Sequence, residues 1–179
     1  MTHPFASRRS FIGLGLAVSA ALLAACSEKK LVFNSIDITG GEMGQDFAIK
    51  DHNGQLRKLA DFAGKVVVVF FGFTHCPDVC PTTLTELVEV KRLLGKDGDR
   101  LQAIFITVDP ERDTPELLKA YMTNFDSTFL ALCPTPAQLA EVAASFKVYY
   151  KKVGDEKSAT YSMEHSAGSY VFDPKGRVR

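Results

Sequence analysis

Two cysteines four positions apart, Cys76 and Cys80, have the clearest chemical meaning in this sequence. An apolar run over residues 66–71 predicts a buried strand, and the cysteines then open an amphipathic helical pattern. Thiols at a helix N-terminus lie near backbone amides, whose partial positive charge favours thiolates. On a helix this spacing places both sulfurs on one face. Two such thiolates can bind a soft metal ion, Cu(I) or Zn(II), or close a disulfide.

The elements that must position this pair alternate between strands and helices. Asn53-Gly54 suits a type I′ turn, so a β-hairpin is expected around it. Thr114 is a candidate N-cap, with Pro115 at the first helical position. Strands are predicted at residues 66–71, 101–108, 129–132 and 169–173, and residues 148–153 are expected to be extended. One helix is predicted from the cysteine pair to about residue 94, a second begins at Pro115, and a third covers residues 136–146. This order predicts an α/β domain whose sheet contains parallel pairs covered on both faces.

Composition limits the possible functions. With 179 residues, 46% of them hydrophobic, the chain can form one globular domain with additional segments. The formal net charge is zero and no basic stripe is present, so we expect no nucleic-acid partner.

The N-terminus has the features of an export signal. Arg8 and Arg9 precede an apolar stretch, residues 11–25, that is too short to span a bilayer. The stretch ends in Leu23-Ala24-Ala25-Cys26, which resembles a bacterial lipobox, where the cysteine is lipidated and becomes the new N-terminus. An ordinary signal peptide is the alternative.

Residues 7–12 also resemble a twin-arginine export signal, with a generic basic region as the alternative. We therefore expect a signal peptide at 1–25, a lipid-anchored linker at 26–45 and a folded domain at 46–179. The mature protein is expected to be tethered to a membrane of the bacterial envelope through Cys26 and to face the periplasm.

The predicted layout resembles the thioredoxin fold, with an added N-terminal hairpin and an insertion around residues 129–146. Thioredoxin-type oxidoreductases use a Cys-x-x-Cys pair that faces a cis-proline. Here three residues separate the cysteines, and the corresponding approach, residues 162–169, contains no proline but does contain His165. Two thiolates and one imidazole form a three-coordinate set suited to Cu(I), with Cu(II) accessible if a further ligand joins.

Three separated segments carry a more specific resemblance. They are residues 70–84, residues 108–115 and His165 followed by Tyr170-Val171-Phe172-Asp173-Pro174. In this order they are similar to the Sco/SenC family, the copper-binding assembly factors of cytochrome c oxidase. The resemblance implies that Cys76, Cys80 and His165 bind copper.

The resemblance also implies a partner, cytochrome c oxidase subunit II. The protein would deliver copper to the dinuclear site of that subunit or reduce the cysteines of that site beforehand. Another periplasmic copper chaperone is a second candidate partner.

Several other functions use the same residues. The cysteines can form a structural disulfide in an exported protein. They can act in thiol–disulfide exchange, one attacking a target disulfide and the other resolving it. A peroxiredoxin-like peroxidase and a redox sensor are further alternatives.

Residues near the cysteines have expected roles as well. Asp78 is expected to hold the cysteine loop through backbone amides or to orient a metal-ligating residue without binding the metal itself. His52 and His75 are expected to be solvated, and Cys133 to be a small buried apolar residue. Residues 109–113 are expected to form an ion-pair network at a helix start near the site.

The chain end also bears on the fold. The family resemblance implies another strand and a final helix after Arg179. We therefore expect a C-terminal truncation that leaves an apolar face uncovered beside the helix that begins at the cysteines.

Overall fold

The computed structural model of the protein describes residues 32–44, 47–155 and 160–179. The predicted signal segment and Cys26 lie outside the described residues. The chain divides into two units, residues 1–36 and 37–179, and every helix and strand of the described residues belongs to the second. Within the described part of the chain, no helix combines the length and apolar character needed to cross a bilayer.

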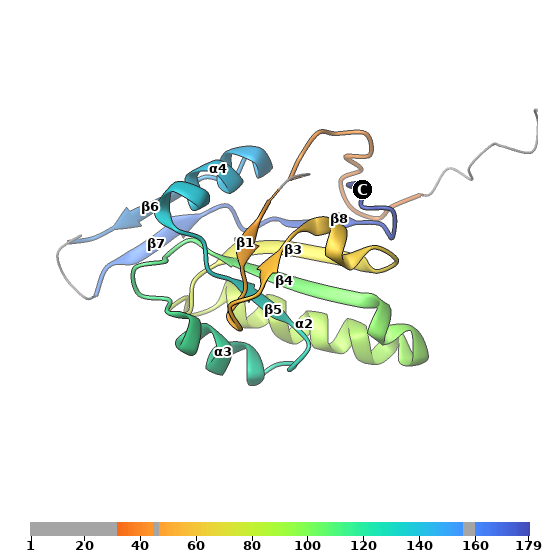
Figure 1. The fold of residues 1–179 in the computed structure, drawn as a ribbon, viewed down its shortest axis with the longest axis horizontal. Coiled ribbons are helices and arrows are strands. Elements are labelled where there is room, and N and C mark those ends of the chain that lie inside the picture. The colour runs from red at the N-terminus through yellow and green to blue at the C-terminus, as the bar shows by residue number, and fades with distance from the viewer. Residues whose placement is uncertain (1–31, 45–46, 156–159) are drawn as a thin grey trace, which may run out of the picture. The chain divides into compact units, whose positions relative to one another are not determined.

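Four strands form the central sheet, in the order β5-β4-β3-β8 (Figure 1). Strands β3 and β4 pair in parallel, as do β4 and β5, whereas β8 is antiparallel to β3. The predicted α/β sheet with parallel pairs is confirmed. Because Gly72 pairs with Thr107 at the C-terminal ends of β3 and β4, the loops that follow them leave from the same edge. The strands are β3 (Val66–Gly72), β4 (Leu101–Thr107), β5 (Leu130–Leu132) and β8 (Ser169–Phe172).

Helices cover both faces of this sheet, as the largely apolar sequences of β3 and β4 require. Helix α4 (Pro136–Phe146) covers one face, where the rings of Phe146 and Phe71 are 5.3 Å apart. Helices α2 (Val79–Leu93) and α3 (Pro115–Thr123) cover the other (Figure 1). Leu84 and Cys80 of α2 and Leu118 of α3 belong to the hydrophobic core between these helices and the sheet, so packing against the sheet fixes the helix that carries Cys80.

The start of helix α2 differs from the prediction. The helix begins at Val79, so Cys80 lies in its first turn while Cys76 lies in the preceding loop. Pro77 explains the shift, because a residue before proline is biased away from helical conformations. The prediction that both cysteines share one helix face is therefore wrong. Helix α2 is followed by the 3-10 helix η2 (Gly95–Arg100).

Helix α3 begins as predicted. Thr114 is its N-cap, with a hydroxyl that accepts a hydrogen bond from Leu117 N at 3.2 Å, and Pro115 follows as the first helical residue. Such a cap satisfies one of the free amides of the first turn.

The predicted N-terminal hairpin is present as β1 (Ile49–Lys50) and β2 (Leu56–Arg57). Its turn is not type I′, which requires two residues with positive φ, because Gly54 has φ of 79° and Asn53 has no positive φ. The hairpin continues onto the edge of the central sheet, where Asp51 forms an antiparallel bridge with Leu132.

His52 belongs to this contact and is not the solvated loop residue expected. Its backbone N–H donates to Ala131 O at 2.9 Å, and its Nδ1 accepts from Ala131 N at 3.1 Å. The half-buried imidazole thus satisfies a backbone amide at the edge of β5.

A second hairpin consists of β6 (Tyr150–Val153) and β7 (Ser162–His165), and we call it the histidine arm. No strand was predicted at the residues of β7. Among the described residues, no ladder joins the histidine arm to the central sheet. The arm therefore depends on side-chain contacts and on its two connections for its position.

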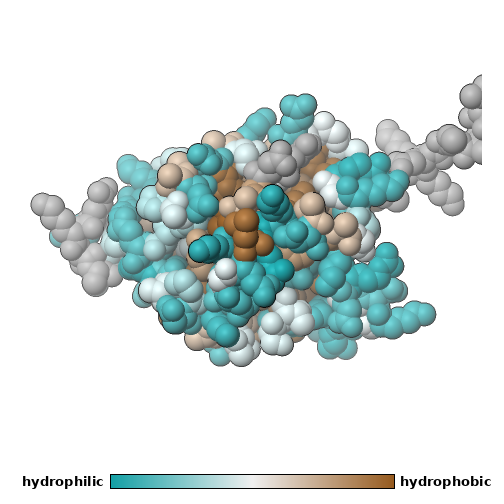
Figure 2. All heavy atoms as spheres, in the orientation of Figure 1, coloured by the Kyte–Doolittle hydropathy of each residue, from teal (hydrophilic) through white to brown (hydrophobic). Residues whose placement is uncertain are grey.

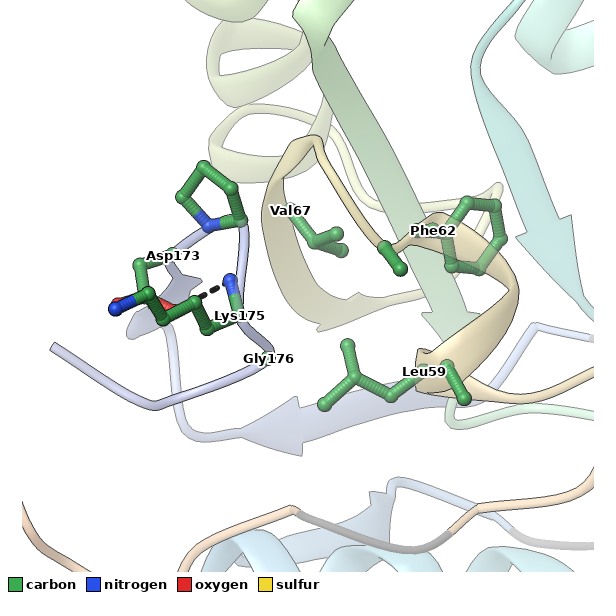
Figure 3. A pocket seen from close by; sticks show the side chains of 9 residues that line it. Leu59, Phe62, Val67, Asp173, Lys175 and Gly176 are labelled. Atoms are coloured by element: carbon green, nitrogen blue, oxygen red, sulfur yellow. Dashed lines mark hydrogen bonds between the residues drawn. The ribbon is translucent and has the colours of Figure 1, made fainter.

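A pocket of about 200 Å³ lies near the N-terminal end of β3 (Figure 3). Its lining includes Leu59 and Phe62 of the 3-10 helix η1 (Leu59–Phe62), Val67 and the turn at residues 173–176. Because Val67 is near the beginning of β3 and the cysteines follow its end, this pocket is not part of the site below.

On the face shown in Figure 2, hydrophilic side chains surround a small group of apolar atoms. Beside α2, Val171 of β8 is 39% exposed and pairs with Val68, which is on the sheet face that α2 covers. Val178 forms an antiparallel bridge with Phe172.

Candidate metal centre

Three side chains meet beyond the C-terminal end of β3. The sulfurs of Cys76 and Cys80 and a ring nitrogen of His165 all lie within 4.8 Å of one another. Over residues 32–44, 47–155 and 160–179, this is the one group of three or more such ligands that could hold a metal ion. Ligand atoms of a three-coordinate ion with bonds of about 2.0–2.3 Å lie roughly 3.5–4.0 Å apart. Small side-chain rotations would therefore complete the site.

Cys80 is the buried member, with 1% of its surface exposed. The pKa of its thiol is raised to about 12, chiefly by burial and also by Cys76 and Asp113, against a hydrogen bond with the Phe73 backbone that lowers it. The expected stabilisation of a thiolate by helix amides is therefore outweighed at Cys80. A metal ion that binds this sulfur must displace its proton.

Gly72, the last residue of β3, makes room for the Cys80 sulfur. A β-carbon at position 72 would lie 2.6 Å from Cys80 Sγ and 2.6 Å from the Phe105 ring. A glycine is thus required here by close approach rather than by backbone conformation.

Cys76 is half-buried and lies in the loop between β3 and α2, where its backbone N–H donates to Phe73 O at 3.1 Å. Asp113 holds this loop. Its carboxylate accepts from Thr74 N at 3.2 Å, from Thr74 Oγ1 at 2.5 Å and from Thr107 Oγ1 at 2.5 Å. Burial raises the pKa of Asp113, and the bonds from the two threonines oppose that shift. The loop is therefore tied to the end of β4.

His165 is the last residue of β7. Its Nδ1 lies 2.9 Å from Ser166 O, and because a carbonyl only accepts, Nδ1 carries the proton. Nε2 is then left as the ligand atom, in the tautomer that such a bond selects. The imidazole also contacts Phe73 edge-on, with ring centroids 5.9 Å apart at 90°.

Three other predicted residues lie outside this group. Asp78 is exposed at the N-cap of α2 and makes no side-chain cap bond, although its Oδ1 is 3.5 Å from Thr82 Oγ1. His75 is exposed, with Nδ1 3.2 Å from Thr74 Oγ1. Cys133 is half-buried against the core under α2 and α3.

The expected ion-pair network after β4 is present at Asp109, Glu111 and Arg112, whereas Asp113 accepts hydrogen bonds from Thr74 and Thr107. The contact of this network with Tyr161 was not predicted. Arg112 pairs with Asp109 at 2.5 Å and lies 3.6 Å from the ring centroid of Tyr161, whose hydroxyl donates to Asp109 at 2.6 Å. A signal was available in the sequence. Tyr161, Met163 and His165 alternate with polar residues, which is typical of a half-buried strand.

Tyr121 was also missed. Its hydroxyl is buried and has no hydrogen-bond partner among the residues that the structure describes. Burial raises the pKa of Tyr121, and the negative charges that Cys80 and Cys76 carry when ionised raise it further.

Comparison with known proteins agrees with this geometry. Residues 37–179 match the SCO1/SenC family. A SCO2-like protein of Rickettsia felis is 34% identical over 167 residues, which cover 92% of this chain and 82% of the relative. The chain belongs to the SCO1/SenC family.

Solved structures of the family share the fold. ScoI of Bradyrhizobium japonicum, solved with copper bound, is 47% identical with a TM-score of 0.71, covering 76% of this chain and 87% of that chain. Yeast Sco1, also solved with copper bound, is 33% identical with a TM-score of 0.70, covering 78% of each chain. The predicted thioredoxin-like fold and family membership are confirmed.

Proposed function

We propose that this protein binds Cu(I) through Cys76, Cys80 and His165 and serves the assembly of cytochrome c oxidase. The convergence of these three ligand atoms within 4.8 Å is the observation that carries the proposal. The copper-bound state of the ScoI relative from Bradyrhizobium japonicum supports copper as the metal. Two sulfurs and one nitrogen form the soft, low-coordinate set that Cu(I) prefers.

Copper is the cargo in this proposal. A three-coordinate ion leaves room for an incoming ligand, so copper can pass by ligand exchange to the dinuclear site of oxidase subunit II. Another periplasmic copper chaperone would supply it. Lipidation at Cys26, which lies outside the described residues, would hold the domain at a membrane on the periplasmic side.

The test is Cu(I) affinity of the reduced protein, measured by competition with a chelator. His165→Ala is expected to weaken binding by more than the roughly 10- to 100-fold that follows loss of a group supporting a ligand. His75→Ala is the matched control, because His75 is next to Cys76 yet outside the ligand group. Equal affinities for wild type and His165→Ala would refute the ligand assignment.

A second function is favoured by the unequal exposure of the two cysteines. Cys76 is half-buried and Cys80 is 1% exposed, which suits an attacking and a resolving thiol. The Cys76 thiolate would attack the disulfide of an oxidised target, form a mixed disulfide with one target sulfur and release the other as a thiolate. Cys80 would then attack Cys76 Sγ and release the remaining target sulfur. The target is thereby reduced to two thiols while Cys76 and Cys80 are oxidised to a disulfide.

This exchange is tested with an oxidised peptide that contains the two copper-binding cysteines of subunit II. Cys80→Ser should trap a mixed disulfide at Cys76, whereas Cys76→Ser should trap none. Failure to trap any adduct, with no reduction of the peptide by wild type, would exclude the exchange.

A further inference from the structure

The histidine arm is positioned by alternating side chains of β7 and of Tyr161, the residue that precedes this strand. Tyr161, Met163 and His165 face inward, whereas Ser162 and Glu164 between them are exposed. Since the arm shares no ladder with the central sheet among the described residues, the contacts of this inward face determine where the imidazole lies.

Tyr161, at the end of this row opposite His165, is held by the loop after β4. Its hydroxyl donates to Asp109 Oδ1 at 2.6 Å, and Arg112 Nη1 donates to the Tyr161 carbonyl at 2.7 Å. Lys152 Nζ lies 4.9 Å from the same ring and pairs with Glu111 at 2.6 Å. Tyr161 is 7% and Asp109 1% exposed, so the bond between them is sheltered from water, and a hydrogen bond to a carboxylate is among the stronger kinds.

The same loop also holds the cysteine side of the site. Asp113 binds the backbone and hydroxyl of Thr74, two residues before Cys76. Residues 109–113 therefore contact both halves of the ligand group, the arm through Asp109 and the cysteine loop through Asp113.

We propose that Tyr161 is a positioning residue for the metal centre, which holds His165 at its distance from the two thiols through the hydroxyl bond to Asp109. The inference rests on the proposed copper function. It assigns to Tyr161 a role in metal affinity, although Tyr161 does not touch the metal.

Tyr161→Phe tests this role because it keeps the ring that Arg112 and Lys152 contact and removes only the hydroxyl. We expect the Cu(I) dissociation constant of the reduced full chain to rise about tenfold, within the range seen for groups that support a ligand. The same substitution in a His165→Ala background should change affinity by less than about twofold, because the arm then carries no ligand. The reduction potential of the Cys76–Cys80 pair should not change.

Tyr170→Phe is the matched control. It removes a hydroxyl bond of similar length, from Tyr170 to Phe146 O at 2.8 Å, on the core face under α4. It should lower the unfolding temperature of the metal-free protein and leave Cu(I) affinity unchanged, which separates positioning from general stability.

The outcomes distinguish the inference from the function on which it rests. Wild-type affinity in Tyr161→Phe, or equal weakening with and without His165, would overturn the positioning role while the ligand set stands. If His165→Ala itself binds Cu(I) as tightly as wild type, the proposed ligand set fails first. Weakening that disappears in the His165→Ala background supports both.

Discussion

Gly72 and Cys80 are in contact across the junction of strand β3 and helix α2, with 2.6 Å between Cys80 Sγ and the position that a β-carbon would occupy on Gly72. No room is left for a side chain at Gly72, because the Phe105 ring of the neighbouring strand fills the same space. The position of the buried ligand is thus set by the absence of a side chain at the end of β3.

Gly72→Ala is therefore expected to displace Cys80 and to destabilise the metal-free protein by about 1–3 kcal/mol, the usual effect of overpacking. Chemical unfolding of the reduced protein measures the stability, and chelator competition measures the accompanying loss of Cu(I) affinity. Gly168→Ala is the control, because an added β-carbon there meets nothing within 4 Å. Equal stabilities of the two variants would contradict the proposed crowding.

Thr74→Val should loosen the cysteine loop. It removes the 2.5 Å bond to the Asp113 carboxylate, and a hydrogen bond to a charged group contributes about 1.5–3 kcal/mol. The free energy of unfolding should fall by about that amount. Thr85→Val, which removes a hydroxyl bond to Pro81 O on the exposed surface of α2, should change it by less than about 0.5 kcal/mol.

His52 predicts a pH dependence of stability. Burial lowers the pKa of His52, and Lys119 and Arg57 lower it further, while Asp51 opposes the shift. As pH falls, the unfolded chain therefore binds the proton first. The stabilising contribution is complete above the ordinary histidine pKa of about 6.5 and is lost as pH falls below it.

His52→Asn removes this titration while offering an amide oxygen near the position of Nδ1. Between about pH 7.5 and pH 5, wild type should lose stability relative to the variant, and exchange of the Ala131 amide hydrogen should accelerate in wild type alone. Parallel stability curves for the two proteins would show that the imidazole does not titrate in this contact.

Tyr121→Phe is expected to be neutral or to raise stability by up to about 1 kcal/mol, because a buried hydroxyl without a partner among the described residues imposes a desolvation cost. Tyr170→Phe should lower stability by about 1 kcal/mol, since it loses a bond to Phe146 O. Thermal unfolding of both reduced proteins provides the comparison. A clear loss in Tyr121→Phe would indicate that its hydroxyl has a partner in solution.

Most of the sheet and its helices could be predicted because their signals are local. Residues 66–71 are an unbroken apolar run, and residues 101–108 are apolar except for Gln102 and Thr107, a pattern typical of strands buried on both faces. Helix α4 has the predicted bounds because Thr135 and Pro136 specify its start and a left-handed Lys147 ends it.

The site was predicted less completely because its supporting contacts are distant in sequence. Asp113 and Thr74 are 39 residues apart, and Tyr161 and Asp109 are 52 apart, so no local pattern links them. The position of Cys76 outside the helix could have been predicted, since Pro77 disfavours a helical conformation for the residue before it. The role of His52 could not be inferred, because it depends on where the hairpin meets the edge of β5.

The contact between the N-terminal hairpin and the edge of β5 has a consequence for self-association. An open sheet edge offers unpaired amides and carbonyls to strands of other molecules, and this is a common route to aggregation. On the β5 side, Cys133 N already donates to Lys50 O, and His52 exchanges hydrogen bonds with Ala131, on either side of the bridge between Asp51 and Leu132. The N-terminal hairpin thus protects this edge of the sheet against strand addition by a second molecule.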